Sequence, residues 1–320
     1  MIRQRTPSAT ASTAALVLAA ACGGSRSVQP SESGDAAPLA GAAGSTAQAL
    51  LFGCVGDARP AIEDDTGGYP TNVVSTLFQR IEALRPWPSF VVATGDYVFA
   101  STGPTSTAAA QLDLFMQARA LYRGQFFPAL GNHECTGATS SNCGPDGVDG
   151  ITPNYAAFVD RLLGPLGLRQ PSYVVHLQAD DASWTAKVVF VAANAWSASQ
   201  GDWLEATLAE PTTYTFVVRH EPASAVDAPG VGPSEAILAR HPYTLSLVGH
   251  SHTYAHDADS PREVVIGNGG APLASKDFGF ALFRQRADGA VVTDMIDWRT
   301  GATDADFHFA VRPDGSPAPP

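Results

Sequence analysis

Five short apolar runs in this chain end abruptly, and each is followed at once by a side chain that can bind a metal ion. The runs occupy residues 51–56, 90–95, 126–131, 214–219 and 244–248. The side chains that follow them are Asp57, Asp96, Asn132, His220 and, after Gly249, His250 and His252. In open α/β sheets the ligands lie beyond the carboxyl ends of the strands. The pattern therefore predicts an α/β fold with one polar site at its strand ends.

Each of these residues is weak evidence when taken alone. An isolated aspartate after a strand is more often a turn or capping residue than a ligand, and a lone His-x-His pair occurs in surface loops. Imidazole is nevertheless the commonest neutral metal ligand, and carboxylate and amide oxygens complete a set of nitrogen and oxygen donors. The recurrence of the pattern five times in one order favours a metal site.

The ordered motifs resemble those of the calcineurin-like metallophosphoesterases. They are Gly56-Asp57, Gly95-Asp96, Gly131-Asn132-His133-Glu134, His220 and Gly249-His250-Ser251-His252. The last motif, together with residues 253–254 and 267–272, is most similar to the purple-acid-phosphatase-like branch. The resemblance covers roughly residues 48–300 and implies a four-layer α/β/β/α sandwich, in which two mixed sheets are flanked by helices.

The resemblance also implies which residues hold two metal ions. Asp57 and His252 would bind the first ion, Asp96 would bridge both, and the second ion would take Asn132, His220 and His250. The donor types suit Fe, Mn, Zn or Co alike. Two such ions activate a bridging hydroxide for in-line attack and neutralise the phosphoryl oxygens.

Three further residues receive roles near the substrate. The resemblance places His133 beside the phosphoryl or leaving-group oxygen, as a general acid or charge stabiliser, and Asn132 near the same group. Glu134 either holds the His133 imidazole in one tautomer or is a surface acid. Arg59 either pairs with the substrate phosphate, for which its planar fork is suited, or lies at the rim of the site.

The chain departs from the family pattern at two positions. Arg59 stands where many members have a histidine that binds the first metal, and Phe99 stands where purple acid phosphatases have a tyrosinate. Without that tyrosinate we predict a colourless site. With fewer matched protein ligands, we expect the first metal to bind weakly or to exchange.

The spacing of apolar residues predicts a single domain over residues 48–312. Strands are expected at 48–56, 90–95, 126–131, 173–177, 187–192, 213–218, 244–248, 263–267, 279–286, 290–296 and 307–311. Helices are expected at 73–84, about 105–123, 152–163, a segment capped by Ser199 that ends at 208, and a segment capped by Ser234 that ends at 240. Residues 313–320 form a Pro-rich tail.

The first 47 residues indicate export. Residues 1–21 combine Arg3 and Arg5 with a short apolar run, as in a secretory signal. The segment before Cys22 resembles a bacterial lipoprotein cleavage site, the alternative being cleavage that releases a soluble protein. Residues 22–47 read as a flexible linker. We expect a periplasmic, outer-membrane-anchored or secreted protein whose only membrane contact is an N-terminal lipid.

Cysteine content and charge narrow the class further. Cys135 and Cys143 flank a loop rich in small residues, and in an oxidising compartment they would form a disulfide rather than remain two free thiols. Cys54 reads as a small buried hydrophobe. A net charge of −12 without any run of Lys or Arg disfavours binding to nucleic acid.

Two functions follow from the sequence. The first is an exported metallophosphoesterase that hydrolyses phosphomonoesters or small phosphodiesters. The alternative is a lipoprotein that binds phosphate or a phosphoester without turnover, because its first metal site has degraded. Only the substitutions at Arg59 and Phe99 support the alternative.

Overall fold

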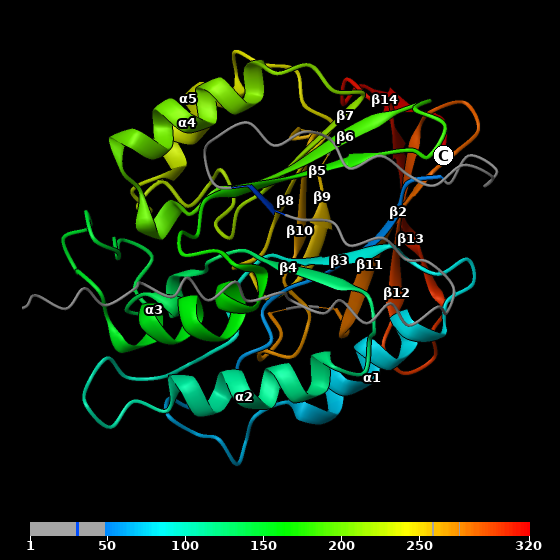
Figure 1. Ribbon diagram of the computed structural model, residues 1–320. Helices are drawn as coiled ribbons and strands as arrows, with labels where there is room; N and C mark the ends of the chain where they lie inside the picture. The colour runs from blue at the N-terminus through cyan, green and yellow to red at the C-terminus, as the bar shows by residue number, and fades with distance from the viewer. Residues whose placement is uncertain (1–29, 32–48, 258, 275) are drawn as a thin grey trace, which may run out of the picture.

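Two seven-stranded β-sheets pack face to face in the computed structural model, and helices cover their outer faces (Figure 1). The structure describes residues 30–31, 49–257, 259–274 and 276–320. Helices α4 and α5 lie over one sheet, at the top of Figure 1, and α1 and α2 lie over the other, at the bottom. The predicted four-layer α/β/β/α sandwich is confirmed.

Sheet A carries the second half of the site. In spatial order its strands are β1 (Pro30–Ser31), β5 (Tyr173–Gln178), β6 (Thr185–Phe190), β7 (Tyr214–Val218), β8 (Leu245–Val248), β10 (Glu263–Ile266) and β9 (Tyr254–His256). The central strands β6, β7, β8 and β10 are parallel, whereas β1, β5 and β9 pair antiparallel. Parallel central strands place their carboxyl ends at one edge, where β7 and β8 lead into the predicted ligands.

Sheet B carries the first half of the site. Its order is β14 (Pro317–Ala318), β13 (Thr303–Val311), β12 (Val291–Asp297), β11 (Gly279–Gln285), β2 (Leu51–Val55), β3 (Phe90–Ala93) and β4 (Gln125–Pro128). Strands β2, β3 and β4 are parallel, and the other four form an antiparallel meander. The three parallel strands end together and lead into the first three predicted motifs.

The helices lie where the apolar spacing predicts them. They are α1 (Thr71–Ala83), α2 (Ala108–Arg119), α3 (Pro153–Phe158), α4 (Ala198–Ala209) and α5 (Val231–Leu238). A π-helical turn (Val159–Leu163) prolongs α3, and 3-10 turns occur at Asn132–Glu134, Gly164–Leu166 and Ala193–Ala195. None of the helices among the described residues is long and apolar enough to cross a bilayer.

The main core lies between the two sheets. The ring of Phe52 in β2 packs edge-on against Phe216 in β7 at a centroid distance of 5.0 Å, and it stacks on Phe283 in β11 at 4.7 Å. A second apolar layer joins α4 and α5 to the outer face of sheet A through Leu204 and Leu238. Cys54 is buried in the main core, as predicted. This packing fixes the two sheets, and hence the two halves of the site, relative to each other.

Some predicted boundaries are wrong for local reasons. Ser197 rather than Ser199 caps α4, because its hydroxyl accepts the N–H of Gln200 at 3.2 Å. Ser234 lies inside α5 and accepts a hydrogen bond from the buried Arg219 at 2.7 Å instead of capping the helix. Within residues 313–320, the Pro-rich tail of the sequence, β14 pairs with β13.

The N-terminal predictions fall largely outside the described residues. The structure does not describe the predicted signal segment 1–21, the predicted lipidation site Cys22 or the linker 22–47, apart from residues 30–31.

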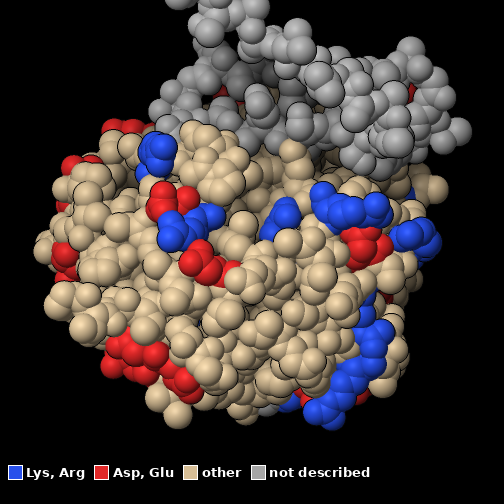
Figure 2. All heavy atoms as spheres, turned by 60° about the horizontal axis from the view of Figure 1, so that its bottom comes forward, with Lys and Arg blue, Asp and Glu red and all other residues tan. Residues whose placement is uncertain are grey.

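On the face shown in Figure 2, Lys and Arg side chains form small groups interleaved with Asp and Glu.

Candidate metal centre

Four of the predicted ligands have a left-handed backbone. Their φ angles are 55° at Asp57, 58° at Asp96, 69° at His250 and 47° at His252. Asp, Asn and His adopt this region more readily than other residues with a side chain, but it still costs about 1–2 kcal/mol per residue. The turns are held by their backbone contacts, such as the bond from Asp57 N–H to Gly95 O at 3.0 Å. Strain of this kind is concentrated at functional sites.

Three side chains form a first ligand set. Asp57, Asp96 and His252 bring one ligand atom each to within 4.8 Å of one another, and both aspartates are buried. The Nδ1 of His252 lies 2.8 Å from the carbonyl oxygen of Pro272. Because a carbonyl can only accept, Nδ1 carries the proton and Nε2 keeps a lone pair that can bind metal. The donors present fit a cation.

A second ligand set lies beside the first. Asn132 Oδ1 is 3.1 Å from both His220 Nε2 and His250 Nδ1, and Asp96 Oδ1 is 3.2 Å from His220 Nε2. His220 Nδ1 lies 2.9 Å from the Thr94 carbonyl, which leaves its Nε2 as the ligand atom. Side chains from four strand ends therefore lie close together, and His220 Nε2 is in contact with the other three.

Asp96 belongs to both ligand sets, as the sequence predicts. Its Oδ1 faces His220 of the second set, and its carboxylate is also grouped with Asp57 and His252 of the first. A carboxylate that both sets share could hold two cations near each other and offset part of their repulsion. The structure therefore brings together all six residues that the sequence nominates as metal ligands.

Burial and neighbouring charged groups shift the pKa values of these residues. Burial raises the pKa of Asp57 to about 8. Burial alone would also raise the pKa of Asp96, but His220 next to it holds that pKa below its usual range. Burial and the neighbouring His220 lower the pKa of His250 to about 4, which keeps its imidazole neutral at pH 7. A neutral imidazole is the form that ligates metal.

His133 lies at the border of the ligand sets without joining them. Its Nε2 is 3.9 Å from Asp96 Oδ2, and its ring packs nearly perpendicular to the Phe99 ring with centroids 4.9 Å apart. Its backbone N–H donates to Asp96 Oδ1 at 3.1 Å. Burial lowers the pKa of the imidazole to about 4. The ring is therefore placed to donate an N–H to a group bound at the metal sets.

Glu134 has a different role from the one that the sequence predicts. It is fully buried, so it is not a surface acid. Its carboxylate accepts four backbone N–H groups, at 2.9 Å from Asp96, 2.7 Å from Tyr97, 3.2 Å from Val98 and 2.9 Å from Gly131. Both oxygens are thus used on backbone donors and not on the preceding imidazole. Glu134 is a positioning residue that joins the Asp96 turn to the Asn132 turn.

Arg59 lies inside the site and not at its rim. Its Nη2 is 3.2 Å from His252 Nε2, and its Nε is 3.7 Å from Asp96 Oδ2. Only 14% of the side chain is exposed. The guanidinium therefore contacts two of the three members of the first ligand set.

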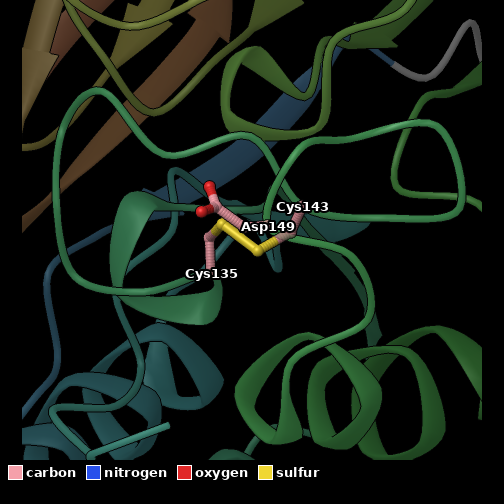
Figure 3. Close-up of side chains that lie close together, drawn as sticks. All are labelled: Cys135, Cys143 and Asp149. Carbon is pink, nitrogen blue, oxygen red and sulfur yellow. A yellow bond between two sulfur atoms is a disulfide. The ribbon is translucent and has the colours of Figure 1, made fainter.

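The predicted disulfide between Cys135 and Cys143 is present (Figure 3). Asp149 lies beside it, so three ligand-type side chains come together. Both sulfur atoms are already bonded to each other, and the Asp149 carboxylate accepts the N–H of Asn142 at 2.6 Å. This cluster is a loop closed by a disulfide and not a further metal site.

Removing the staple is expected to destabilise the protein. A Cys135→Ser/Cys143→Ser double variant should lose about 2–3 kcal/mol of unfolding free energy, because the short loop is no longer closed in the unfolded chain. Urea denaturation measures the change, and wild-type protein kept reduced should reproduce it. An unchanged midpoint would show that the staple does not limit stability.

The sequence does not reveal every residue that shapes the site. Thr94 and Pro272 orient the imidazoles of His220 and His252 through their backbone carbonyls. A carbonyl leaves no signature in a side-chain pattern, so only the fold identifies these two. In the sequence Phe99 is notable only because it replaces a tyrosinate, whereas the structure places its ring against His133.

The fold and the grouping of these side chains can be compared with those of known proteins. Residues 51–254 match the calcineurin-like phosphoesterase family, and the chain belongs to that family. No curated protein matches the chain in sequence.

Solved structures of phosphatases share the fold. A purple acid phosphatase from seeds of yellow lupin (Lupinus luteus) has a TM-score of 0.57 and 14% identity, covering 83% of this chain and 54% of that one. A dimetal phosphatase from Danio rerio has a TM-score of 0.53 and 14% identity, covering 82% of this chain and 99% of that one. The chain thus spans about half the length of the lupin protein. At these identities the likeness concerns the fold alone.

Proposed function

We propose that this protein is an exported, metal-dependent phosphoesterase that hydrolyses phosphomonoesters or small phosphodiesters by in-line attack of an activated water. The observation that carries the proposal is the pair of ligand sets that share Asp96. Family membership supports the reaction class. The donor types favour two ions drawn from Fe, Mn, Zn and Co.

The residues of the site have two roles: some would bind the metal ions, and others would contact the substrate. Metal ions bound at the two sets would supply water activation and neutralisation of the phosphoryl oxygens. Asn132 contributes a neutral oxygen, which limits the negative charge of a site that must admit an anion. His133 offers an N–H beside Asp96, where a phosphoryl or leaving-group oxygen would accept it.

Replacing His133 tests the second of these roles. His133→Ala should lower kcat by about 10²–10³-fold, the usual contribution of one positioned proton donor or charge stabiliser. Because the imidazole is outside both ligand sets, the metal content should stay at the wild-type level. Turnover and bound metal should be measured on the same sample, with His308→Ala as a control histidine on β13. A loss of metal together with activity would assign His133 to the ligands.

Export belongs to the proposal because two independent features support it. Residues 1–21 have the composition of a secretory signal, and a disulfide such as Cys135–Cys143 persists in oxidising compartments. We propose a periplasmic, outer-membrane-anchored or secreted protein, with Cys22 as the candidate lipid attachment site. Labelling with a fatty-acid probe in wild type and Cys22→Ala distinguishes the anchored form from the soluble one.

The second candidate, a phosphate- or phosphoester-binding protein without turnover, is favoured by one observation. Arg59 contacts two of the three residues of the first ligand set, so that set is already partly neutralised. The two candidates differ in a simple readout. The binding protein would take up phosphate without hydrolysing any ester when metal is supplied.

A further inference from the structure

We propose that Arg59 is an internal competitor of the metal ion at the first ligand set. The second set would then fill first, and an ion would enter the first set only by displacing the guanidinium. This inference rests on the proposed metal-dependent function, but it concerns binding and does not require turnover. It makes Arg59 a determinant of metal stoichiometry rather than a residue of the rim.

At His252, Arg59 and a metal ion would compete for the same lone pair, which lies on the imidazole Nε2. Nδ1 of this imidazole faces the Pro272 carbonyl and carries the proton, so the single lone pair is on Nε2. Arg59 Nη2 lies 3.2 Å from that atom and, since a guanidinium can only donate, it donates an N–H to it. One lone pair cannot serve an N–H donor and a metal ion together.

The contact with Asp96 shows the same competition for charge. Arg59 Nε is buried, has no hydrogen-bond partner among the described residues, and lies 3.7 Å from Asp96 Oδ2. The guanidinium therefore already places a positive charge against the carboxylate that the first set shares. A cation added beside it would be repelled at short range. Because Nε makes no hydrogen bond, the position of the guanidinium depends on its attraction to the Asp96 carboxylate and on the other contacts of the Arg59 side chain.

Two neighbours outside the ligand sets hold Arg59 in this position. Its guanidinium carbon lies 4.9 Å from the centroid of the Phe99 ring, and its Nη1 donates to the Pro60 carbonyl at 3.2 Å. Stacking of a guanidinium on an aromatic ring is favourable. The two positions at which the chain departs from its family are thus in contact and act as one unit.

The second ligand set has a different arrangement. Asn132 Oδ1 lies 3.1 Å from both His220 Nε2 and His250 Nδ1, so its ligand atoms face one another. Of the ligand residues, Arg59 makes a hydrogen bond to His252, which belongs to the first set alone, and an ion pair to Asp96, which both sets share. We therefore expect the second set to bind the first equivalent of metal and the first set to bind the next one more weakly.

The experiment is a titration of the chelator-stripped full chain with Mn²⁺. Binding is monitored by calorimetry and by the electron paramagnetic resonance signals of the free and the bound ion. The wild type should bind one Mn²⁺ tightly and a second at least about tenfold more weakly, because of the repulsion described. Arg59→Met, which keeps the length but not the charge, should tighten the second event by about tenfold or more. Arg59→Lys, which keeps the charge, should tighten it much less.

Two further variants complete the design. Phe99→Leu removes the ring on which the guanidinium stacks, and should tighten the second event without changing any charge. Arg123→Met removes an exposed arginine that pairs with Glu82, and should leave both events unchanged. Phe99→Leu also keeps the proposal open to refutation if Arg59→Met fails to fold.

The outcomes separate this inference from the proposed function. Equal affinity for two ions in the wild type, or a second event that Arg59→Met leaves unchanged or weakens, would overturn the inference while leaving the metal-dependent function intact. Failure of every folded variant to bind Mn²⁺, Fe²⁺, Zn²⁺ or Co²⁺ would overturn both. A second event that tightens in Arg59→Met and Phe99→Leu supports the inference whatever the rate of hydrolysis.

Discussion

Asp96→Asn should lower kcat/KM by about 10⁴-fold, a loss of about 5.5 kcal/mol of transition-state stabilisation. Asp96 is the only carboxylate common to the two ligand sets, with Oδ1 at 3.2 Å from His220 Nε2. The asparagine side chain keeps the shape of the aspartate and one oxygen that can accept the backbone N–H of His133, so the turn should persist. It loses the negative charge that brings two cations together. Both bound metal and activity should therefore fall.

The measurement pairs hydrolysis of p-nitrophenyl phosphate with metal content by mass spectrometry. Asp113→Asn is the matched control, since Asp113 is an exposed carboxylate that pairs with Arg161 away from the ligand sets. Its metal content and activity should equal those of the wild type. Full activity in Asp96→Asn would show that the shared carboxylate is not needed for catalysis.

Glu134→Ala should lower the unfolding free energy by about 4 kcal/mol, because four buried backbone N–H groups lose their acceptor at about 1 kcal/mol or more each. These donors belong to the turn that carries Asp96 and to Gly131, which precedes Asn132. Glu134→Gln should cost roughly half as much, since its amide retains one acceptor oxygen but turns an NH₂ toward the other donors. Urea denaturation of the stripped protein measures both changes without interference from bound metal.

Glu63→Ala supplies the control, because Glu63 is exposed. It should change the unfolding free energy by less than about 0.5 kcal/mol. A Glu134→Ala variant as stable as this control would mean that the four N–H groups find water or other acceptors. The positioning role of Glu134 would then fail.

The sequence predicts well which residues come together at the site, because strand ends obey a simple geometry. Parallel strands β2, β3 and β4 end at one edge of sheet B, and β7 and β8 end at the facing edge of sheet A. A residue just beyond such an end therefore has few places to go. Asp57, Asp96 and His220 are buried within a few residues of their strands, as this geometry requires.

The direction of a side chain within the site is harder to predict. Glu134 follows His133 in the sequence, which favours an interaction between neighbours. The 3-10 turn at Asn132–Glu134 instead sends its carboxylate back to the Asp96 turn, 38 residues away along the chain. Arg59 is similar, because its position depends on the Phe99 ring and the His252 lone pair, both supplied by distant segments.

Helix caps show the same limit on a smaller scale. Ser197 and Ser199 are equally good caps by residue type, and only the bond from Gln200 N–H to Ser197 Oγ decides between them. Ser234 has the composition of a cap, but the buried Arg219 uses its hydroxyl. Local propensity identifies the helix, and tertiary contacts fix its first residue.

The most direct test of the proposed function is hydrolysis of p-nitrophenyl phosphate and of its bis-ester by chelator-stripped protein refilled with Mn, Fe, Zn or Mg. We predict that stripping abolishes turnover and that at least one of the first three metals restores it, because the ligands are nitrogen and oxygen donors of the type these ions prefer. The ratio of the two rates then distinguishes a monoesterase from a diesterase. Absence of turnover with every metal, while calorimetry shows that the ions bind, would contradict the account and leave the binding protein as the function of this site.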